Sequence, residues 1–251
     1  ALLAGLASKL VVLAIVRILL LVFPGEEARQ LLLVLGIIGV ISGELAAWQA
    51  RDVARMLAWS SVGQLGIVFI AFSLPGTIGI VAGVAVALHH LVVKSALFLL
   101  AERWGGAIDT LRGAATASWL GAAMFVLFAL SLLGLPPLPG FWSKFLVLTG
   151  LAEGGTTLQL LALATILIGT VIEGAYLLRV ITRLYAAPGD TGVPSTHRAA
   201  SLLASGLFAT ALLGAAVFVD PLWLVLNDLA AQGIDTTGYV QTVLGGMEGA
   251  R

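Results

Sequence analysis

Ionisable side chains interrupt the long apolar stretches of this sequence at a few positions, and their types could do chemistry. They are Lys9, Arg17, Glu44, His89, His90, Lys94, Lys144 and Glu173. An ionisable group at bilayer depth costs at least ~2.5 kcal/mol on insertion scales, so by default it marks an ion pathway. Lysine and histidine can take a proton from one neighbour and pass it to the next. These residue types therefore predict a proton relay that crosses several helices at mid-depth.

The strongest relay candidates lie in one apolar stretch and after one break. His90 and Lys94 are four residues apart, so they share a helix face, with His89 beside them. Lys144 follows segment 134–140, whose three prolines and two glycines cannot continue a helix. We expect a broken helix with its hinge at Gly134, Pro136, Pro137, Pro139 and Gly140. Lys144 should then lie in the first turn of the second half-helix. The helix dipole repels a cation there, which suits a group that gains and loses a proton.

Several of these residues also have a structural alternative. Lys9 and Arg17 could extend along apolar surface to the membrane interface, and Lys144 could do the same beside a purely structural kink. Glu44 lies near the end of its span, where extension to the interface and pairing with a neighbouring lysine are both open. Glu173 could balance the charge of Lys144, end the relay, or hydrogen-bond to an adjacent helix. Residue types alone leave these choices open.

The composition indicates what kind of chain must position these residues. Of 251 residues, 60% are hydrophobic and 10% are charged, the formal net charge is zero, and the mean hydropathy is +1.08. A soluble domain carries ~25% charged residues, so a soluble enzyme, a nucleic-acid-binding protein and a disordered chain are excluded. The absence of cysteine excludes disulfides and Cys-ligated metals, and we expect no cofactor and no metal. Ala1 begins an apolar run without a signal peptide's basic region, as if cut from a longer chain.

Long continuous apolar runs predict an all-α polytopic membrane protein with about seven transmembrane helices, one of them broken. The runs cover residues 2–23, 31–50, 56–74, 77–101, 118–151, 157–186 and 199–219. After Asp220 and Pro221 the tail is too short and too polar to span a bilayer. We therefore expect an interfacial helix in the tail.

Basic residues in the short loops predict the orientation of these spans. One side receives the loops that carry Arg51 and Arg55, Arg103 and Arg112, and Arg179, Arg183 and Arg198. The other side receives Arg29 and Arg251. The positive-inside rule makes the first side cytoplasmic and the C-terminus non-cytoplasmic. Tryptophans near the span ends predict an interfacial aromatic belt that contains Trp48, Trp104, Trp119 and Trp223.

Three segments resemble motifs of a known family. Residues 52–66, DVARMLAWSSVGQLG, resemble a DLKRLLAYSSxxQxG segment, and residues 89–99, HHLVVKSALFL, resemble a central HHxxxKxALFL helix. Residues 134–145, GLPPLPGFWSKF, resemble a GLPPxxGFxxK break. These motifs are typical of the antiporter-like subunit family. It comprises the proton-pumping subunits of respiratory complex I, membrane-bound hydrogenases and Mrp-type multisubunit Na+/H+ antiporters.

The resemblance covers nearly the whole chain and implies a division into three parts. Family members usually have fourteen helices built from two inverted five-helix repeats, and this chain looks like helices eight to fourteen. Residues 1–30 would be a linking transmembrane helix. Residues 31–186 would be the second repeat, with its broken helix at 134–140. Residues 187–251 would be a final transmembrane helix and an interfacial C-terminal tail.

The resemblance also implies roles for individual residues. Lys9 looks like the lysine that links two half-channels. His90 and Lys94 look like the central relay, with His89 as a neighbour, and Lys144 looks like the terminal residue nearest the exit. Glu44 stands where the family usually has an apolar or small residue, so the resemblance gives it no role.

Two branches of the family remain open. Residues 233–245 resemble the DPxAYIxAVLG ending of the D-type subunit of Mrp antiporters, which favours a proton-translocating subunit of a multisubunit cation/proton antiporter. Residues 172–179 resemble a VEAxYLLR pattern of hydrogenase-associated relatives. The alternative is therefore a proton-pumping subunit of NADH–quinone oxidoreductase or of a membrane-bound hydrogenase. A third hypothesis is a truncated scaffold that no longer conducts.

The resemblance implies partners and a location as well. The expected partners are other membrane subunits of a hetero-oligomeric complex, protons, Na+ as an open alternative, and the lipid bilayer, with no nucleic acid. The expected location is a bacterial cell (inner) membrane. The chain would have no catalytic chemistry of its own in an antiporter, and would be a translocase subunit in a redox complex.

Overall fold

The computed structural model describes residues 14, 25–188 and 199–234. Lys9, Arg17 and Arg198 lie outside the described residues, and so do residues 235–251 of the tail. In the described part the regular elements are helical, apart from an isolated bridge between Asp52 and Ala107. The predicted all-α class is confirmed.

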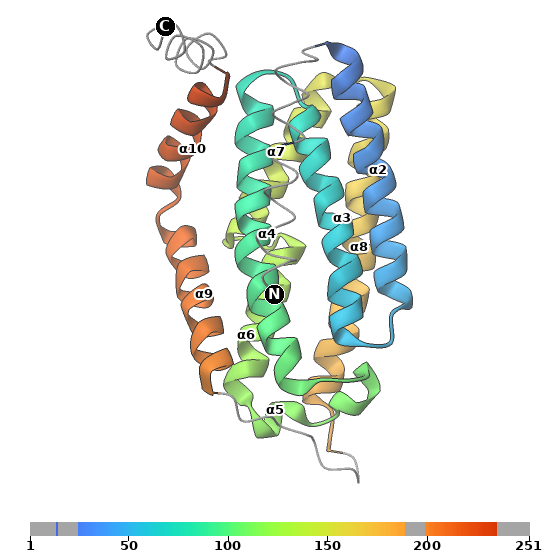
Figure 1. Ribbon diagram of the computed structural model, residues 1–251, viewed down its shortest axis with the longest axis vertical. Coiled ribbons are helices and arrows are strands. Elements are labelled where there is room, and N and C mark those ends of the chain that lie inside the picture. The colour runs from blue at the N-terminus through green and yellow to red at the C-terminus, as the bar shows by residue number, and fades with distance from the viewer. Residues whose placement is uncertain (1–13, 15–24, 189–198, 235–251) are drawn as a thin grey trace, which may run out of the picture.

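From α2 to α8 the helices follow one another with short connections (Figure 1). They are α2 (Glu26–Gln49), α3 (Val53–Ser73), α4 (Gly76–Trp104), the 3-10 turn η2 (Ile108–Leu111), α5 (Ala114–Ala117), α6 (Trp119–Leu133), α7 (Pro139–Gly154), α8 (Thr157–Tyr185), α9 (Ala199–Val217) and α10 (Val219–Ile234). Five of them, α2, α3, α4, α8 and α9, are long and apolar enough to cross a membrane. The total of seven spans stays a prediction, because the first predicted span lies outside the described residues.

Local signals in the sequence fix where several helices begin. The Asp52 carboxylate accepts the Arg55 N–H at 2.9 Å and caps the start of α3. At the start of α8, Thr156 and Gln159 form a capping box in which each side chain accepts the other's backbone N–H. Short connections then place α2 antiparallel to α3, and α3 antiparallel to α4 (Figure 1).

The α2–α3 loop, the α4–α6 connection and the end of α8 meet at one end of the bundle (Figure 1). Ile108 N–H donates to the Arg51 carbonyl oxygen at 2.8 Å, which ties the α4–α6 connection to the α2–α3 loop. Arg183, near the end of α8, pairs with Asp109 at 3.0 Å. These connections therefore lie at the same end of the bundle, and the side of the membrane that this end faces stays a prediction.

The broken helix is present, but its non-helical part is shorter than predicted. α6 ends at Gly134, whose φ of +80° terminates the helix in the left-handed conformation. α7 already begins at Pro139, because proline lacks only an N–H that the first helical residue does not need. Pro139 and Gly140 are thus helical, not part of the break. Lys144 consequently lies in the second turn of α7, not in the first.

The described part of the tail forms a helix. α10 continues beyond α9 along the side of the bundle, next to α4 (Figure 1). Leu226 and Ala230 of α10 are buried against Val81 of α4. α10 therefore packs lengthwise against α4, and its position at a membrane interface stays a prediction.

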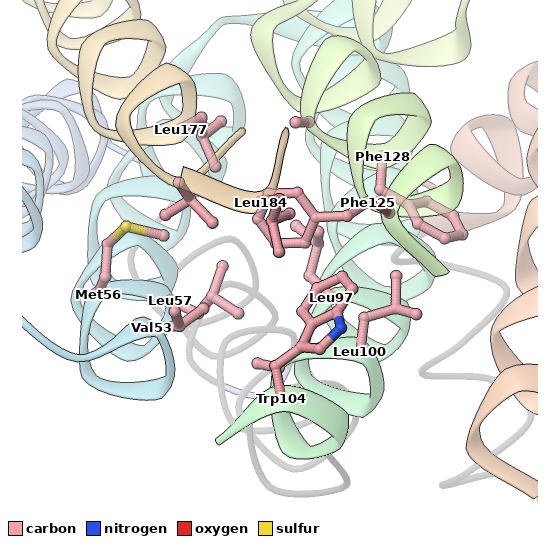
Figure 2. Close-up of a cluster of buried hydrophobic side chains, with 14 of the residues drawn as sticks. Val53, Met56, Leu57, Leu97, Leu100, Trp104, Phe125, Phe128, Leu177 and Leu184 are labelled. Atoms are coloured by element: carbon pink, nitrogen blue, oxygen red, sulfur yellow. The ribbon is translucent and has the colours of Figure 1, made fainter. Parts of the chain in front are cut away.

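Two apolar clusters fill the interior of the bundle at different heights. The loop-end cluster, shown in Figure 2, includes Val53, Met56, Leu57, Leu97, Leu100, Trp104, Phe125, Phe128, Leu177 and Leu184. The opposite cluster includes Leu32, Ile37, Val40, Ile67, Ile70, Phe72, Val86, Val147, Leu151 and Ile166. Trp104 contradicts the predicted aromatic belt. It is 3% exposed, because its ring packs edge-on against Phe125 at 5.9 Å between centroids.

Candidate functional site

Buried polar residues form a layer between the two apolar clusters. Along α2, Glu44 lies between Val40 of the opposite cluster and Ala47, which packs in the loop-end cluster. The same order holds on α3, α4 and α8 for the buried residues Ser60, Gln64, His90 and Glu173. These are single polar residues within apolar helices, and the packing of the helices brings them together at a similar height.

One part of this layer is an ion-pair cluster formed by Lys144, Glu173 and Gln64. The Lys144 ammonium donates to Glu173 Oε2 at 3.0 Å. Gln64 Nε2 donates to both oxygens of the same carboxylate, at 2.9 and 3.1 Å. Lys144 also lies 3.3 Å from Thr170 Oγ1. α7, α8 and α3 thus hold one positive and one negative charge together.

The break between α6 and α7 makes room for Lys144. A Cβ atom on Gly134 would lie 3.3 Å from Lys144 Cδ, so the lysine stem passes directly over this glycine. The ammonium then reaches Glu173, whose side chain is 1% exposed. The structure therefore brings Glu173 into direct contact with Lys144.

The other part of the layer is a hydroxyl chain formed by Lys94, Ser60, Tyr176 and Glu44. The Lys94 ammonium donates to Ser60 Oγ at 2.5 Å. The Tyr176 hydroxyl lies 2.7 Å from Ser60 Oγ and 2.9 Å from Glu44 Oε2. All four residues are at most 2% exposed. Two neutral hydroxyl groups therefore connect a buried amine on α4 to a buried carboxyl group on α2.

Two glycines shape the space that receives Glu44. A Cβ atom on Gly63 of α3 would collide with the Glu44 carboxylate. A Cβ atom on Gly169 of α8 would lie 3.4 Å from Glu44 Cγ. Glu44 is 2% exposed, so it does not extend to an interface, and its hydrogen-bond partner is a tyrosine hydroxyl.

The two adjacent histidines face different surroundings. His90 is fully buried on the same face of α4 as Lys94. His89 Nε2 lies 2.9 Å from Ser131 Oγ, close to the end of α6. His89 also lines a mostly apolar cavity of about 290 Å³ between α4, α7, α9 and α10, together with Ser143. His89 is thus placed at the helix break, whereas His90 is placed in the interior.

Shared helices hold the ion-pair cluster and the hydroxyl chain next to each other. Ser60 and Gln64 are four residues apart on α3, and Glu173 and Tyr176 are three apart on α8. Such pairs lie on one helix face about one turn, ~5.4 Å, apart. Each group contains one lysine and one glutamate, so opposite charges accompany each other into the low-dielectric interior. Among the residues that the structure describes, no cluster of histidine and carboxylate groups could hold a metal ion.

Sequence reasoning did not single out Ser60, Gln64 or Tyr176 as site residues. Gln64 carried a usable signal, because an amide in the middle of an apolar span needs a partner. Ser60 lies one turn before it and would share that face. Tyr176 gave no comparable signal, since tyrosine packs readily in apolar surroundings.

The chain matches a family model described as "NADH:quinone oxidoreductase/Mrp antiporter, TM" over residues 1–172. It is 30% identical to NADH-quinone oxidoreductase subunit N of Desulforudis audaxviator, over 74% of this chain and 38% of that protein. It is 29% identical to the D-type subunit of the Na+/H+ antiporter of Alkalihalophilus pseudofirmus, over 97% of this chain and 51% of that protein. The chain therefore spans about half the length, or less, of these relatives.

Solved structures show the same fold. A chain of the Mrp complex from Dietzia sp. DQ12-45-1b aligns with a TM-score of 0.84 at 24% identity, over 96% of this chain and 54% of that one. A chain of respiratory complex I from Thermus thermophilus aligns with a TM-score of 0.70 at 26% identity, over 83% and 45%. With the family model matching more than half of the sequence, the chain belongs to the NADH:quinone oxidoreductase/Mrp antiporter transmembrane family.

Proposed function

We propose that this chain is part of a proton-translocating subunit of a multisubunit cation/proton antiporter, like the D-type subunit of Mrp antiporters. The observation that carries this proposal is that Lys94 and Lys144 are both buried among the helices, where Lys94 donates to Ser60 and Lys144 donates to Glu173. Placing a lysine inside the membrane costs free energy, so a buried lysine indicates a functional site. A broken helix beside one of these lysines is typical of ion-transport sites.

In this proposal a proton passes along Lys9, the pair His90 and Lys94, and Lys144. His89 stands beside the helix break, where its contact with Ser131 joins α4 to the end of α6. Glu173 balances the charge of Lys144.

The proposal includes the organisation and surroundings of the chain. Residues 1–30 act as the linking helix, residues 31–186 as the second repeat, and residues 187–251 as the final helix and tail. The end with Arg51, Arg55 and Arg183 faces the cytoplasm of a bacterial cell. Other membrane subunits of the complex are the partners.

Replacing the relay lysines tests the proposal. In proteoliposomes with the assembled complex, Lys94→Met and Lys144→Met should each abolish pH-gradient-driven cation transport, because methionine fills similar space but carries no proton. Arg29→Ala removes an exposed charge paired with Glu26 and is the control that should transport normally. Normal transport by both lysine variants, at equal amounts of assembled complex, would overturn the relay.

The alternative is a proton-pumping subunit of NADH–quinone oxidoreductase or of a membrane-bound hydrogenase. Similarity to subunit N of Desulforudis audaxviator favours this alternative. The D-type antiporter subunit of Alkalihalophilus pseudofirmus aligns with a larger share of this chain, 97% against 74%, which favours the antiporter. Purification of the native complex under mild conditions separates the two. Small antiporter subunits in the purified complex support the first function, and quinone-reducing or hydrogenase subunits support the second.

A further inference from the structure

Glu44 is a buried carboxyl group that the relay of lysines and histidines leaves without a role. We propose that Glu44 is a proton-storage site of the relay, loaded from Lys94 through the hydroxyl groups of Ser60 and Tyr176. This inference rests on the proposed function, because it needs Lys94 to carry protons. It adds α2 to the helices that take part in proton movement.

Hydrogen-bond chemistry gives this chain of four groups a direction. The Lys94 ammonium can only donate, and the ionised Glu44 carboxylate can only accept. The Tyr176 hydroxyl has one hydrogen, which must go to Glu44 if that carboxylate is to be satisfied at 2.9 Å. The hydrogen between Ser60 and Tyr176, 2.7 Å apart, then belongs to Ser60. Each hydroxyl thus accepts one hydrogen bond and donates one.

This arrangement allows a proton to move by successive short transfers. Lys94 gives a proton to Ser60 Oγ, Ser60 gives its own proton to the Tyr176 oxygen, and Tyr176 gives its proton to Glu44. An N–H bond breaks at Lys94 and an O–H bond forms at Glu44, while both hydroxyls end with one hydrogen each. The net change turns an ammonium and a carboxylate into a neutral amine and a neutral acid.

The transfer neutralises Lys94 and Glu44 together, which is favourable for two groups buried away from water. All four groups are buried, so a single transferred charge without a compensating one would be strongly opposed. Here the two charges disappear together, and the hydroxyl chain reverses its polarity. In the reversed state Glu44 donates to Tyr176, Tyr176 to Ser60 and Ser60 to the amine of Lys94, with no heavy atom displaced.

The packing around Glu44 supports a dedicated site. The carboxylate lies where a side chain on Gly63 would collide with it, and its stem lies against Gly169. The glycines of α3 and α8 therefore leave a slot of the size of this side chain, opening toward the Tyr176 hydroxyl. With a proton stored there, Lys94 is free to accept a second one from the relay.

The test replaces each member of the hydroxyl chain in the assembled complex in proteoliposomes. Tyr176→Phe, which keeps the packed ring, Ser60→Ala and Glu44→Gln should each slow proton transport roughly 10²-fold, as for loss of a positioned proton-transfer group. Combining Tyr176→Phe with Glu44→Gln should slow it no further, because both changes cut the same path. Tyr185→Phe and Ser42→Ala, the same changes at exposed positions, are the controls and should transport normally.

Infrared difference spectroscopy during turnover provides a readout that a structural role would not move. The carbonyl band of a protonated carboxyl group should appear in the parent complex, vanish in Glu44→Gln, and form far more slowly in Tyr176→Phe. A band unchanged in Tyr176→Phe, or normal transport by Glu44→Gln and Tyr176→Phe, would overturn the storage site. If Lys94→Met abolishes transport in that case, the proposed function stands. Normal transport by Lys94→Met and Lys144→Met would overturn both.

Discussion

The ion-pair cluster and the hydroxyl chain contain the same two kinds of charge and are one helical turn apart, yet they are built differently. Lys144 touches Glu173 directly at 3.0 Å, whereas two hydroxyls separate Lys94 from Glu44. Direct contact makes the attraction large in a low dielectric, which fixes the two side chains. The hydroxyl bridge weakens that attraction but supplies exchangeable hydrogens. We therefore expect the direct contact to fix where the relay residue Lys144 lies, and the hydroxyl chain to provide a path along which a proton can move.

Removing half of the ion pair should give the largest loss of stability. Lys144→Met leaves Glu173 buried without its cation and should lower the free energy of unfolding by about 3–5 kcal/mol. Chemical unfolding in mixed micelles measures this. Arg29→Ala, which breaks the exposed pair with Glu26, should cost less than ~1 kcal/mol. A loss for Lys144→Met as small as that of Arg29→Ala would contradict the role of the ion pair in fixing these side chains.

The second-largest loss of stability should come from a substitution that fills the space occupied by the Glu44 side chain. Gly63→Ala forces the Glu44 carboxylate away from Tyr176 and should cost about 1–3 kcal/mol of unfolding free energy, as overpacking does. The cost should shrink when Glu44→Ala is added, since the colliding side chain is then gone. Gly214→Ala, at a position with open space, should cost less than either. If Glu44→Ala leaves the cost of Gly63→Ala unchanged, the slot is not shaped for this carboxylate.

Tyr176→Phe should have a smaller effect on stability. It removes the hydroxyl between Ser60 and Glu44 but keeps the buried ring, so the loss should be about 1–2 kcal/mol, at the upper end for hydrogen bonds between membrane helices. Unfolding in micelles alongside Tyr185→Phe gives the comparison. A loss as large as that of Lys144→Met would mean that the hydroxyl chain, too, serves mainly to fix side chains.

The smallest effect should come from Thr170→Val. Thr170 contacts Lys144 at 3.3 Å, but Lys144 keeps its shorter contact with Glu173, so both stability and transport should change little, by ~0.6 kcal/mol or less. Ser60→Ala, also the loss of one hydroxyl beside a lysine, should slow transport strongly. Equal effects of Thr170→Val and Ser60→Ala on proton transport would contradict the proposed difference between the ion-pair cluster and the hydroxyl chain.

The sequence was sufficient to predict the helices and the ionisable residues within them, but not which helices pack against one another. Apolar runs predicted the five long apolar helices of the described residues, and the prolines after Gly134 predicted the break. The break is shorter than predicted because the prediction counted every proline in 134–140 as a helix breaker. Pro139, however, is acceptable as a first helical residue. The lengthwise packing of α10 depends on a partner face on α4, which periodicity within the tail does not reveal.

The contacts within the polar layer could not be predicted from the sequence. Gln64 and Glu173 are 109 residues apart, and their meeting depends on the packing of α3 beside α8. His90 and Lys94 could be predicted to share a face because helix periodicity is local. Ser60 and Tyr176 are ordinary residues until the fold places their hydroxyls between two buried charges. Trp104 was misplaced because interfacial enrichment is a statistical tendency, whereas its burial follows from the fit against Phe125.

The most direct test measures proton transport by the assembled complex that carries Lys144→Met together with Glu173→Gln. This double variant removes both charges of the ion pair, so it should assemble and unfold much like the parent protein. If Lys144 carries protons, transport should nevertheless be lost. Transport at the parent rate in the double variant would contradict the account, because the buried lysine would then serve only to neutralise Glu173.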